Sequence, residues 1–343
     1  MAKSPALLDT ALTRQLGIEL PLVCGAMYPC SNPELVGAVS REGGIGVIQP
    51  LTLTYVHGLE FRAGVRRVRA LAGDRPLGMN ALIEQSSRVY RERMARWVNV
   101  ALEEGVRFFV TSLGNPRWVV DAVAAAGGVV YHDVTERKWA LKARDGGVHG
   151  LIGVNERAGG HAGAKSAHAL LEELADLGLP VLCAGGIGDA PDFVAALRMG
   201  YAGVQMGTRF IATDECAAHE TYKRAIVAAH ADDIVLTERV TGVPLAVIRT
   251  PLVERVGTTV GPLGRVLLRG RRTKHWARAW YAMRSAWRMK RSRVRGDTTR
   301  DYWQAGKSVA GVLAVEPVAA IVARFRTAVS PQPSALSVRP SDG

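Results

Sequence analysis

The 343-residue sequence predicts an α/β fold, a (β/α)8 barrel of parallel strands, on three observations. Eight short apolar segments recur from residue 20 onwards, most of them followed by a helical pattern. These segments are continuous apolar runs rather than alternating ones, as in parallel strands that are covered on both faces. The last three, at 149–155, 181–184 and 203–206, run into glycine-rich turns, which fits the strand–turn–helix repeat of such barrels.

An open, doubly wound sheet is the alternative fold. A dinucleotide-binding sheet of that kind carries G-x-G-x-x-G directly after its first strand. The corresponding residues 25–29, Gly-Ala-Met-Tyr-Pro, lack this pattern. The barrel is therefore the favoured prediction.

The elements follow one another in a regular order. The expected strands span residues 20–24, 45–48, 76–82, 106–113, 129–132, 149–155, 181–184 and 203–206. The expected helices between them span residues 32–42, 88–104, 116–126, 135–144, 166–177 and 190–199. Asn32 and Pro33 suit the start of the first of these helices, because asparagine favours the N-cap and proline the first turn. The connection over 49–75 has the least regular pattern.

The chain is expected to divide into four parts: a barrel over 15–213, a small, mainly helical lid over 214–260, a basic helical segment closing onto the barrel over 261–327, and a tail over 328–343. Within the lid, we expect a helix over 214–231 and an irregular segment over 241–248. The tail is rich in proline and serine, a composition that predicts disorder.

The composition indicates a soluble, cytoplasmic protein. Hydrophobic residues make up 48% and charged residues 22% of the chain, as in ordinary globular domains. No apolar run approaches the ~18 residues that a membrane span needs, and the first ten residues do not form a signal peptide. The four cysteines show no CxxC spacing, so we expect reduced thiols rather than a metal site or a disulfide framework.

The net charge of +13 comes almost entirely from one segment. Residues 262–300 hold 13 Lys or Arg and one acid, a net charge of +12, which leaves about +1 for the rest. In the helix expected over 274–291, Trp276, Trp280 and Trp287 share one stripe with Met283. Such a stripe packs on its own domain more often than it contacts a ligand, so we expect no dedicated nucleic-acid partner. An acidic carrier protein or an anionic membrane surface remains a possible partner of this segment.

The glycine-rich turns after the last two strands predict a phosphate site. In (β/α)8 barrels the loops at the carboxyl ends of the strands build the active site, and those after strands seven and eight often bind phosphate. Glycine lets backbone N–H groups approach a phosphate, and the following helix N-terminus adds a favourable dipole. The candidates are Gly185, Gly186, Gly207 and Thr208, whose hydroxyl can also donate.

His161 is the leading catalytic candidate. It lies in a glycine-rich turn at the carboxyl end of a strand, and an imidazole suits general base work near neutral pH. A histidine in such a turn can also serve only to cap a helix. His132, at the end of another expected strand, is the second candidate, and His219 is expected to lie on the surface or in the lid.

Three runs taken together resemble the nitronate monooxygenase family, formerly called 2-nitropropane dioxygenases. They are 158–163 (Ala-Gly-Gly-His-Ala-Gly), 180–187 (Pro-Val-Leu-Cys-Ala-Gly-Gly-Ile) and 203–213 (Gly-Val-Gln-Met-Gly-Thr-Arg-Phe-Ile-Ala-Thr). Supporting matches extend the resemblance to about residues 15–327; they lie at 33–46, 78–80, 296–297, 305–306 and 315–317. FMN-dependent enoyl-acyl-carrier-protein reductases, NADH:quinone reductases and polyketide-associated enoyl reductases are similar in the same places.

The resemblance implies a TIM barrel that binds FMN without a covalent bond, beneath a small second domain. Its motifs match ten cofactor-binding positions of this chain: Gly25, Ala26 and Met27 lining the flavin ring, Asn80 at the ring edge, Ala158 and Gly159 near the ring or ribityl chain, and Gly185, Gly186, Gly207 and Thr208 at the phosphate.

The implied activity is that of an FMN-dependent oxidoreductase, in the first place a nitronate monooxygenase. Such an enzyme oxidises an alkyl nitronate with O2 to a carbonyl compound and nitrite, and His161 would orient the nitronate or act as the base. The alternative is an NAD(P)H-dependent reductase of an enoyl thioester or a quinone. Three positions depart from the family pattern and leave the substrate open: Arg157 replaces a usual glutamate, Asp133 stands where some relatives have lysine, and Lys307 replaces a glutamine.

Overall fold

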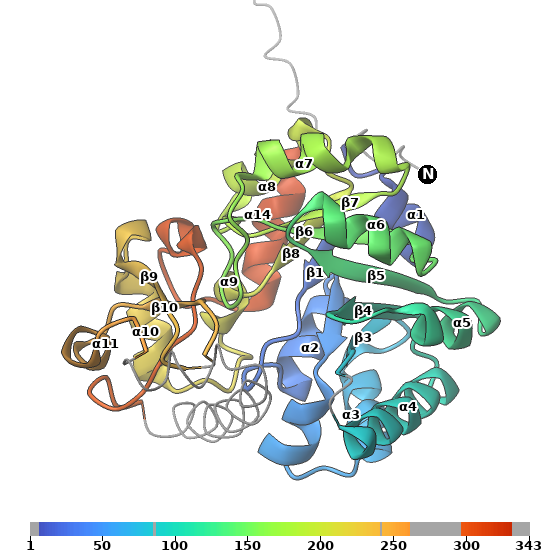
Figure 1. Cartoon of the computed structure of the whole chain (residues 1–343), viewed down its shortest axis with the longest axis horizontal. Coiled ribbons are helices and arrows are strands. Elements are labelled where there is room, and N and C mark those ends of the chain that lie inside the picture. The colour runs from blue at the N-terminus through green and yellow to red at the C-terminus, as the bar shows by residue number, and fades with distance from the viewer. Residues whose placement is uncertain (1–6, 85–86, 241, 261–295, 331–343) are drawn as a thin grey trace, which may run out of the picture.

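The structure, a computed structural model, describes residues 7–84, 87–240, 242–260 and 296–330. Eight parallel strands close into a barrel in chain order, with β1 paired to both β2 and β8 (Figure 1). The strands are β1 (Leu22–Cys24), β2 (Ile45–Ile48), β3 (Leu77–Leu82), β4 (Phe108–Ser112), β5 (Val129–Val134), β6 (Gly150–Val154), β7 (Val181–Ala184) and β8 (Gly203–Met206). The predicted (β/α)8 barrel is confirmed, and all eight expected strands are present.

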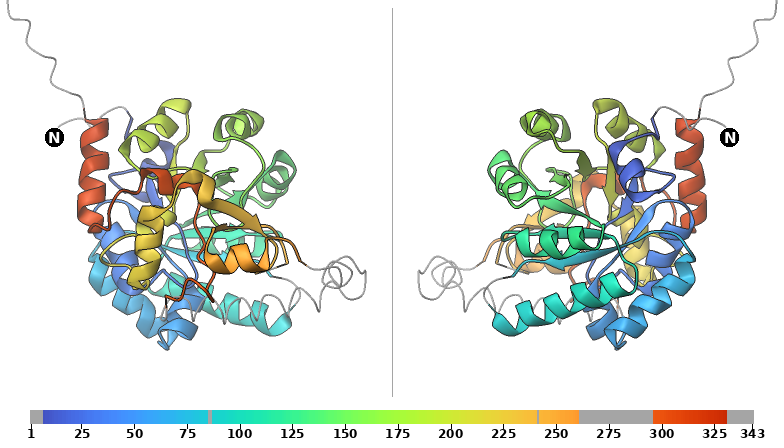
Figure 2. Two further views of the ribbon diagram at one scale, coloured as in Figure 1. Left: turned by 90° about the vertical axis from the view of Figure 1, so that its left-hand side faces the viewer. Right: turned by 90° about the vertical axis from the view of Figure 1, so that its right-hand side faces the viewer.

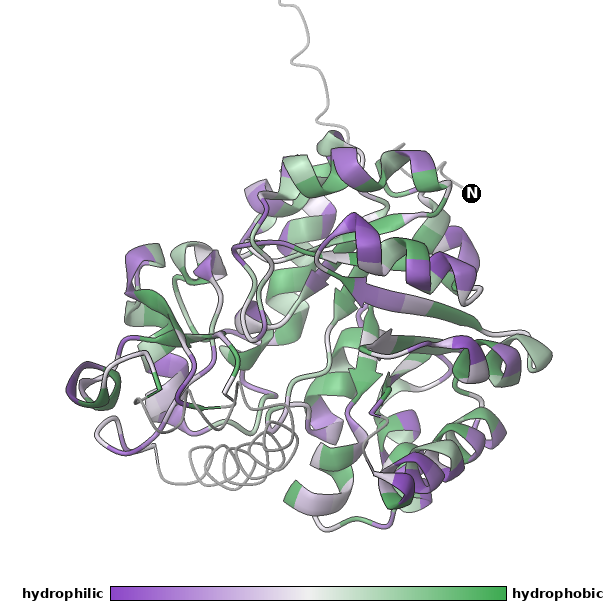
Figure 3. Cartoon of the chain, viewed as in Figure 1, coloured by the Kyte–Doolittle hydropathy of each residue, from purple (hydrophilic) through white to green (hydrophobic). Residues whose placement is uncertain are grey.

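Helices connect the strands on the outside of the barrel. They are α1 (Ala11–Leu16), α2 (Pro33–Arg41), the π-helix η1 (Thr52–Val56), α3 (Phe61–Ala72), α4 (Arg88–Glu103), α5 (Arg117–Ala125), α6 (Arg137–Asp145), α7 (Ala167–Leu174), the 3-10 turn η2 (Ala175–Leu177), α8 (Ala190–Met199) and α9 (Thr208–Ile211). The six helices expected between the strands all form. Hydrophobic residues predominate on most barrel strands, whereas hydrophilic and hydrophobic residues alternate along the surrounding helices; β5 also carries a hydrophilic stretch (Figure 3).

The strands bury apolar side chains on both faces, as their continuous hydrophobicity predicts. One cluster fills the barrel and includes Val23, Val47 and Tyr131. A larger cluster lies between the strands and the surrounding helices and includes Val130 and Val134. Successive residues of a strand therefore point alternately into the barrel and out toward the helices.

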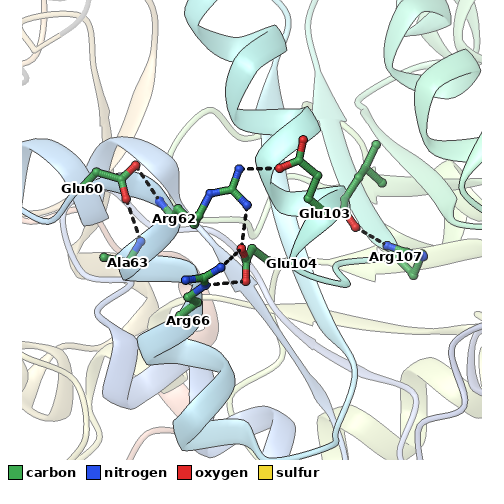
Figure 4. A network of polar contacts seen from close by, with 8 residues as sticks. Glu60, Arg62, Ala63, Arg66, Glu103, Glu104 and Arg107 are labelled. Atoms are coloured by element: carbon green, nitrogen blue, oxygen red, sulfur yellow. Dashed lines mark hydrogen bonds and ion pairs between the residues drawn. The ribbon is translucent and has the colours of Figure 1, made fainter.

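The irregular 49–75 connection contains a helix that its sequence pattern does not reveal. Helix α3 carries four arginines, and two of them are neutralised by the end of α4 (Figure 4). Arg62 contacts both Glu103 and Glu104, and Arg66 Nε donates to Glu104 at 2.9 Å. Glu60 accepts from two backbone N–H groups at the start of α3. Ion pairs with a segment some forty residues later in the chain thus stabilise this arginine-rich helix.

Asn32 starts α2 without capping it. Its side chain makes no hydrogen bond to the helix backbone, contrary to prediction. Instead, Asn32 Nδ2 donates to the carbonyl oxygen of Glu215 at 2.8 Å, and Oδ1 accepts from Ala217 N at 2.9 Å. These bonds join the first βα loop to the chain beyond the barrel and hold residues 215–217 out of a helix.

The lid differs in detail from its prediction. Its elements are α10 (Glu220–Ala228), the 3-10 turn η3 (Ala231–Asp233), β9 (Ile234–Thr237), β10 (Leu245–Ile248) and α11 (Pro251–Val256). The helix expected over 214–231 is shorter because the preceding residues bond to other segments. The irregular 241–248 segment contains β10, which pairs with β9 in an antiparallel sheet. That sheet is stabilised by a small core of its own with α11.

The C-terminal segment returns from the lid to the barrel through a 3-10 helix, η4 (Lys307–Gly311), and helix α14 (Val318–Val329). Helix α14 lies beside α8 and α2 on the outside of the barrel (Figure 2), with Phe325 stacked on Phe193. The tryptophan-bearing helix expected over 274–291 and most of the basic segment lie outside the described residues. Within the described residues, no helix is both long and apolar enough to cross a membrane.

Candidate functional site

Four loops pack against one another at the carboxyl ends of the strands. They follow β1, β6, β7 and β8. A methyl group added to Gly207, after β8, would lie 3.3 Å from Met27 Sδ, after β1. A methyl group on Gly159, after β6, would lie 3.4 Å from Thr208 Oγ1. The glycine turns predicted from the sequence therefore lie together at the carboxyl end of the barrel. We call this end, formed by the loops after β1, β6, β7 and β8, the mouth.

Asn155 ties the β6 loop to the β7 loop. Its fully buried side chain follows β6, where Oδ1 accepts from Arg157 N at 2.8 Å and Nδ2 donates to Gly185 O at 2.9 Å. Its backbone oxygen accepts from Gly163 N at 3.2 Å. Both ends of the turn that carries His161 are thus fixed by one residue. This role of Asn155 is not among the predicted ones, although a polar residue at the end of an apolar strand is a signal for it.

The β7 turn exposes backbone rather than side chains to the mouth. Gly185 and Gly186 have φ of +117° and +83°, values that L side chains rarely adopt. A methyl group on Gly185 would lie 2.6 Å from Ala158 N, and one on Gly186 would lie 2.9 Å from Arg157 Nε. Helix α8 follows directly. A glycine turn leading into a helix N-terminus is a typical cradle for phosphate.

The C-terminal segment and the lid close over the β6 loop. Gly306 N donates to Thr208 Oγ1 at 3.0 Å, so this hydroxyl accepts one bond and keeps its proton for another acceptor. Ala246 in β10 donates to the carbonyl oxygen of Gly160 at 2.8 Å. The residue next to His161 is therefore hydrogen-bonded to the lid.

His161 lies at this mouth as an exposed residue, yet the protein surrounds its imidazole closely enough that burial lowers its pKa. Near pH 7 the imidazole is therefore neutral and able to accept a proton. His219, expected on the surface or in the lid, is the N-cap of α10, where its Nδ1 accepts from Thr221 N at 3.2 Å.

Polar side chains inside the barrel form the floor of the mouth. Asp133 points into the barrel, because it lies two residues after the inward-facing Tyr131 on β5. Gln205 also points into the barrel, because its neighbours on β8 both point outward. A methyl group on Gly25 would lie 2.9 Å from Gln205 Cγ. Asn80 also points inward, from β3 on the far side of the barrel from β7. The apolar interior thus ends in a polar layer at the carboxyl ends of the strands.

His132 does not reach the mouth. It alternates with Asp133 on β5 and so points toward the outer helices, where it is 4% exposed and its Nδ1 lies 2.8 Å from Thr111 Oγ1. Burial lowers the pKa of His132 to about 4. The second catalytic candidate is thus a buried structural histidine.

The burial of His132 predicts a loss of stability in acid. Between pH 6.5 and about pH 4, the unfolded chain binds a proton at this residue and the folded chain does not, so stability falls as pH falls. The whole effect is about 3 kcal/mol at ~1.36 kcal/mol per pKa unit. Urea unfolding at pH 7 and pH 4.5 should show wild type losing more stability than His132→Gln. Equal losses in the two proteins would contradict this assignment.

The structure brings most of the predicted site residues together. Nine lie in the mouth loops: Gly25, Ala26 and Met27 after β1, Ala158 and Gly159 after β6, Gly185 and Gly186 after β7, and Gly207 and Thr208 after β8. Asn80 lies within β3 rather than in a loop, and belongs to the polar layer below these loops. Two buried polar atoms in the floor, Asp133 Oδ1 and Gln205 Oε1, have no hydrogen-bond partner among the described residues. Glycine turns, unused polar atoms and one exposed imidazole suit a flat heterocyclic ring with a phosphate.

The three positions that depart from the family pattern all lie at this mouth. Arg157 packs beside Gly186, and Asp133 belongs to the floor. The backbone N–H of Lys307 donates to the carbonyl oxygen of Arg157 at 2.9 Å. The departures therefore gather at the mouth rather than being scattered over the chain. The described residues contain no cluster of metal-ligating side chains.

Curated proteins and solved structures match most of this chain. One curated relative is the (3aS,4S,5R,7aS)-5-hydroxy-7a-methyl-1-oxo-octahydro-1H-indene-4-carboxyl-CoA dehydrogenase of Mycobacterium tuberculosis, 34% identical over 73% of this chain and 68% of that protein. A nitronate monooxygenase of Pseudomonas aeruginosa is 29% identical over 67% of this chain and 77% of that protein. The solved structure of FabK from Thermotoga maritima superposes with a TM-score of 0.76 at 27% identity, covering 94% of this chain and 96% of that one.

The family assignment rests on nearly the whole barrel and its closing segment. The family model described as nitronate monooxygenase matches residues 9–325, a range that includes the glycine turns, His161 and helix α14 up to its last turn. The resemblance noted from three sequence runs is thereby confirmed. The chain belongs to the nitronate monooxygenase family of oxidoreductases.

Proposed function

We propose that this protein is an FMN-dependent oxidoreductase that acts on a coenzyme A thioester. The observation that carries the proposal is the shared mouth, where the glycine turns of β7 and β8 and the His161 turn pack together under the lid. This arrangement supports one ligand with a phosphate at the glycine turns and a flat ring over the floor. FMN has this shape, and the family resemblance implies it.

The residues have distinct roles in holding FMN. The turns at Gly185–Gly186 and Gly207–Thr208 would bind the phosphate with backbone N–H groups, and Thr208 would add its hydroxyl proton. The β1 loop and Asn80 would contact the ring. Arg157, an exposed cation beside Gly186, suits a phosphate of FMN or of the substrate. When bound, FMN would accept or supply the electrons of the reaction.

His161 would handle the proton. Because its pKa is lowered, the imidazole is neutral near pH 7 and can take a proton from a carbon or hydroxyl group of the substrate. The hydrogen bond from Ala246 to Gly160, the preceding residue, would orient the turn toward the ring site. The lid would exclude water above it.

Two observations favour a coenzyme A thioester as the substrate. Relatives from Mycobacterium tuberculosis and Rhodococcus jostii, both named as dehydrogenases of a carboxyl-CoA substrate, are 34% and 31% identical to this chain, above the 29% of the nitronate monooxygenase. Arg157 adds positive charge at the mouth where the family commonly has glutamate, which suits a polyphosphorylated substrate. The basic segment 262–300 would add to the same attraction.

Nitronate oxidation is the second candidate. The Pseudomonas aeruginosa relative is named for this activity, and a histidine at the mouth suits an anionic nitronate. NAD(P)H-dependent reduction of an enoyl thioester or a quinone would use the same mouth. In that case electrons would pass from NAD(P)H through the flavin to the substrate, rather than from the substrate to the flavin.

Anaerobic mixing of the FMN-loaded protein distinguishes these activities. A panel of acyl-CoA thioesters, propionate 3-nitronate, NADH and NADPH would be mixed in turn while flavin absorbance at its visible maximum is followed. We expect an acyl-CoA thioester to bleach the flavin fastest. Bleaching by propionate 3-nitronate but by none of the thioesters would overturn the thioester proposal and favour the monooxygenase. Fast bleaching by a pyridine nucleotide would favour a reductase.

A further inference from the structure

Two polar side chains lie close together inside the barrel, and each has an oxygen atom without a hydrogen-bond partner among the described residues. Asp133 on β5 and Gln205 on β8 come from strands that are not neighbours, so their contact crosses the barrel interior. Gln205 lies close enough to Asp133 to favour the carboxylate form of that group. Even so, Asp133 Oδ1 and Gln205 Oε1 remain buried without a partner among the described residues. Buried polar atoms of this kind call for an explanation, because desolvation without a partner is costly.

The position of the pair points to a ligand. Asp133 is the last inward-facing residue of β5, and Gln205 is the last of β8, just before the Gly207 turn. The barrel interior below them is filled by apolar side chains, Tyr131 among them. The open side of the pair therefore faces the mouth. Structural carboxyl groups are normally satisfied within the fold, so two unsatisfied atoms at the ligand end favour a role in binding.

Among the residues that the structure describes, the surroundings of Asp133 supply no compensating charge. The neighbouring strands present Ser112 from β4 and Ile152 and Val154 from β6, and His132 on its own strand faces outward. Burial raises the pKa of Asp133 to about 7, against which the nearby Gln205 acts only partly. The carboxyl group therefore gains or loses a proton within the ordinary working range of pH.

We propose that Asp133 and Gln205 form the floor beneath the ring of the bound flavin, and that the proton on Asp133 decides whether this floor is neutral or negative. The inference rests on the proposed FMN site. A carboxylate under the ring opposes the addition of electrons, whereas the protonated acid does not. The floor thus makes the reduction potential of the bound flavin depend on pH, beyond the dependence that free flavin has.

Midpoint potentials of the FMN-bound protein from pH 5.5 to 8.5 test this proposal. At the acid end of this pH range, we expect wild type and Asp133→Asn to have equal midpoint potentials. As pH rises and the carboxyl group loses its proton, the midpoint potential of the wild type should fall progressively below that of Asp133→Asn. Asp145→Asn, an exposed change at the end of α6, should follow wild type at every pH. Gln205→Met, which removes the donor that favours the carboxylate, should move the divergence to higher pH.

Each outcome decides a different question. Parallel potentials for wild type and Asp133→Asn at all pH values would overturn the proposed floor while leaving FMN binding intact. Failure of the wild type to bind FMN would instead contradict the proposed function. Urea unfolding of the apoprotein then reports on Asp133 itself. Because its folded-state pKa is raised, wild type should lose stability relative to Asp133→Asn as pH rises from about 4 to about 7.

Discussion

Replacement of Gly185 by alanine is expected to weaken FMN binding at least ~100-fold, equivalent to about 2.7 kcal/mol. At φ +117° the alanine would be strained, and its methyl group would lie 2.5 Å from Asn155 Oδ1 and 2.6 Å from Ala158 N. Neither neighbour is a flexible side-chain end, because Asn155 is buried and bonded on both sides. The β6 and β7 loops must therefore separate. Titration of apoprotein with FMN, followed by quenching of flavin fluorescence, measures the loss.

Gly178→Ala provides a matched control for backbone strain. Gly178 has φ +70° at the end of η2, and a methyl group there would meet no atom within 4 Å. This variant should lose roughly 1 kcal/mol of stability and bind FMN as wild type does. A folded Gly185→Ala protein with unchanged FMN affinity would show that the β7 turn does not form the phosphate site.

Replacement of His161 by alanine is expected to lower kcat by about 10²- to 10⁴-fold, the usual contribution of a general base. FMN affinity should stay near that of wild type, because Asn155, the glycine turns and the bond from Ala246 to Gly160 remain in place. Steady-state kinetics with the substrate found by anaerobic mixing, together with an FMN titration, separates turnover from binding.

His168→Ala is the control, since His168 is an exposed residue of α7 beside Glu172. The pH profile adds a second readout. Since burial lowers the pKa of His161, wild-type kcat/KM should stay level as pH falls to 6.5 and decline below the lowered pKa, where the base is protonated. Turnover by His161→Ala equal to that of wild type would make this residue structural.

The sequence was sufficient to predict the barrel because each strand is a continuous apolar run bounded by glycine or a helical pattern. It was insufficient where neighbouring elements decide the local structure. Helix α3 depends on ion pairs with Glu103 and Glu104 from a helix some forty residues later. Strand β10 depends on pairing with β9 and on a bridge to Gly160, none of which local propensity encodes.

The site shows the same division. Glycines and His161 could be placed at the mouth because strand ends share one face of a barrel. The role of Asn155 depends on where two loops meet, and the contact between Asp133 and Gln205 depends on which strands face each other across the barrel. Asn155 and Gln205 were visible as polar residues in apolar runs, but the residues that they contact were not.

FMN binding by the purified protein tests the account most directly. We expect a yellow protein, or an apoprotein that becomes yellow with FMN, which releases about one equivalent of FMN per chain on heat denaturation. Riboflavin, which lacks the phosphate held by the glycine turns, should bind much more weakly. A folded protein that remains colourless and gives no saturable signal when titrated with FMN would contradict the account.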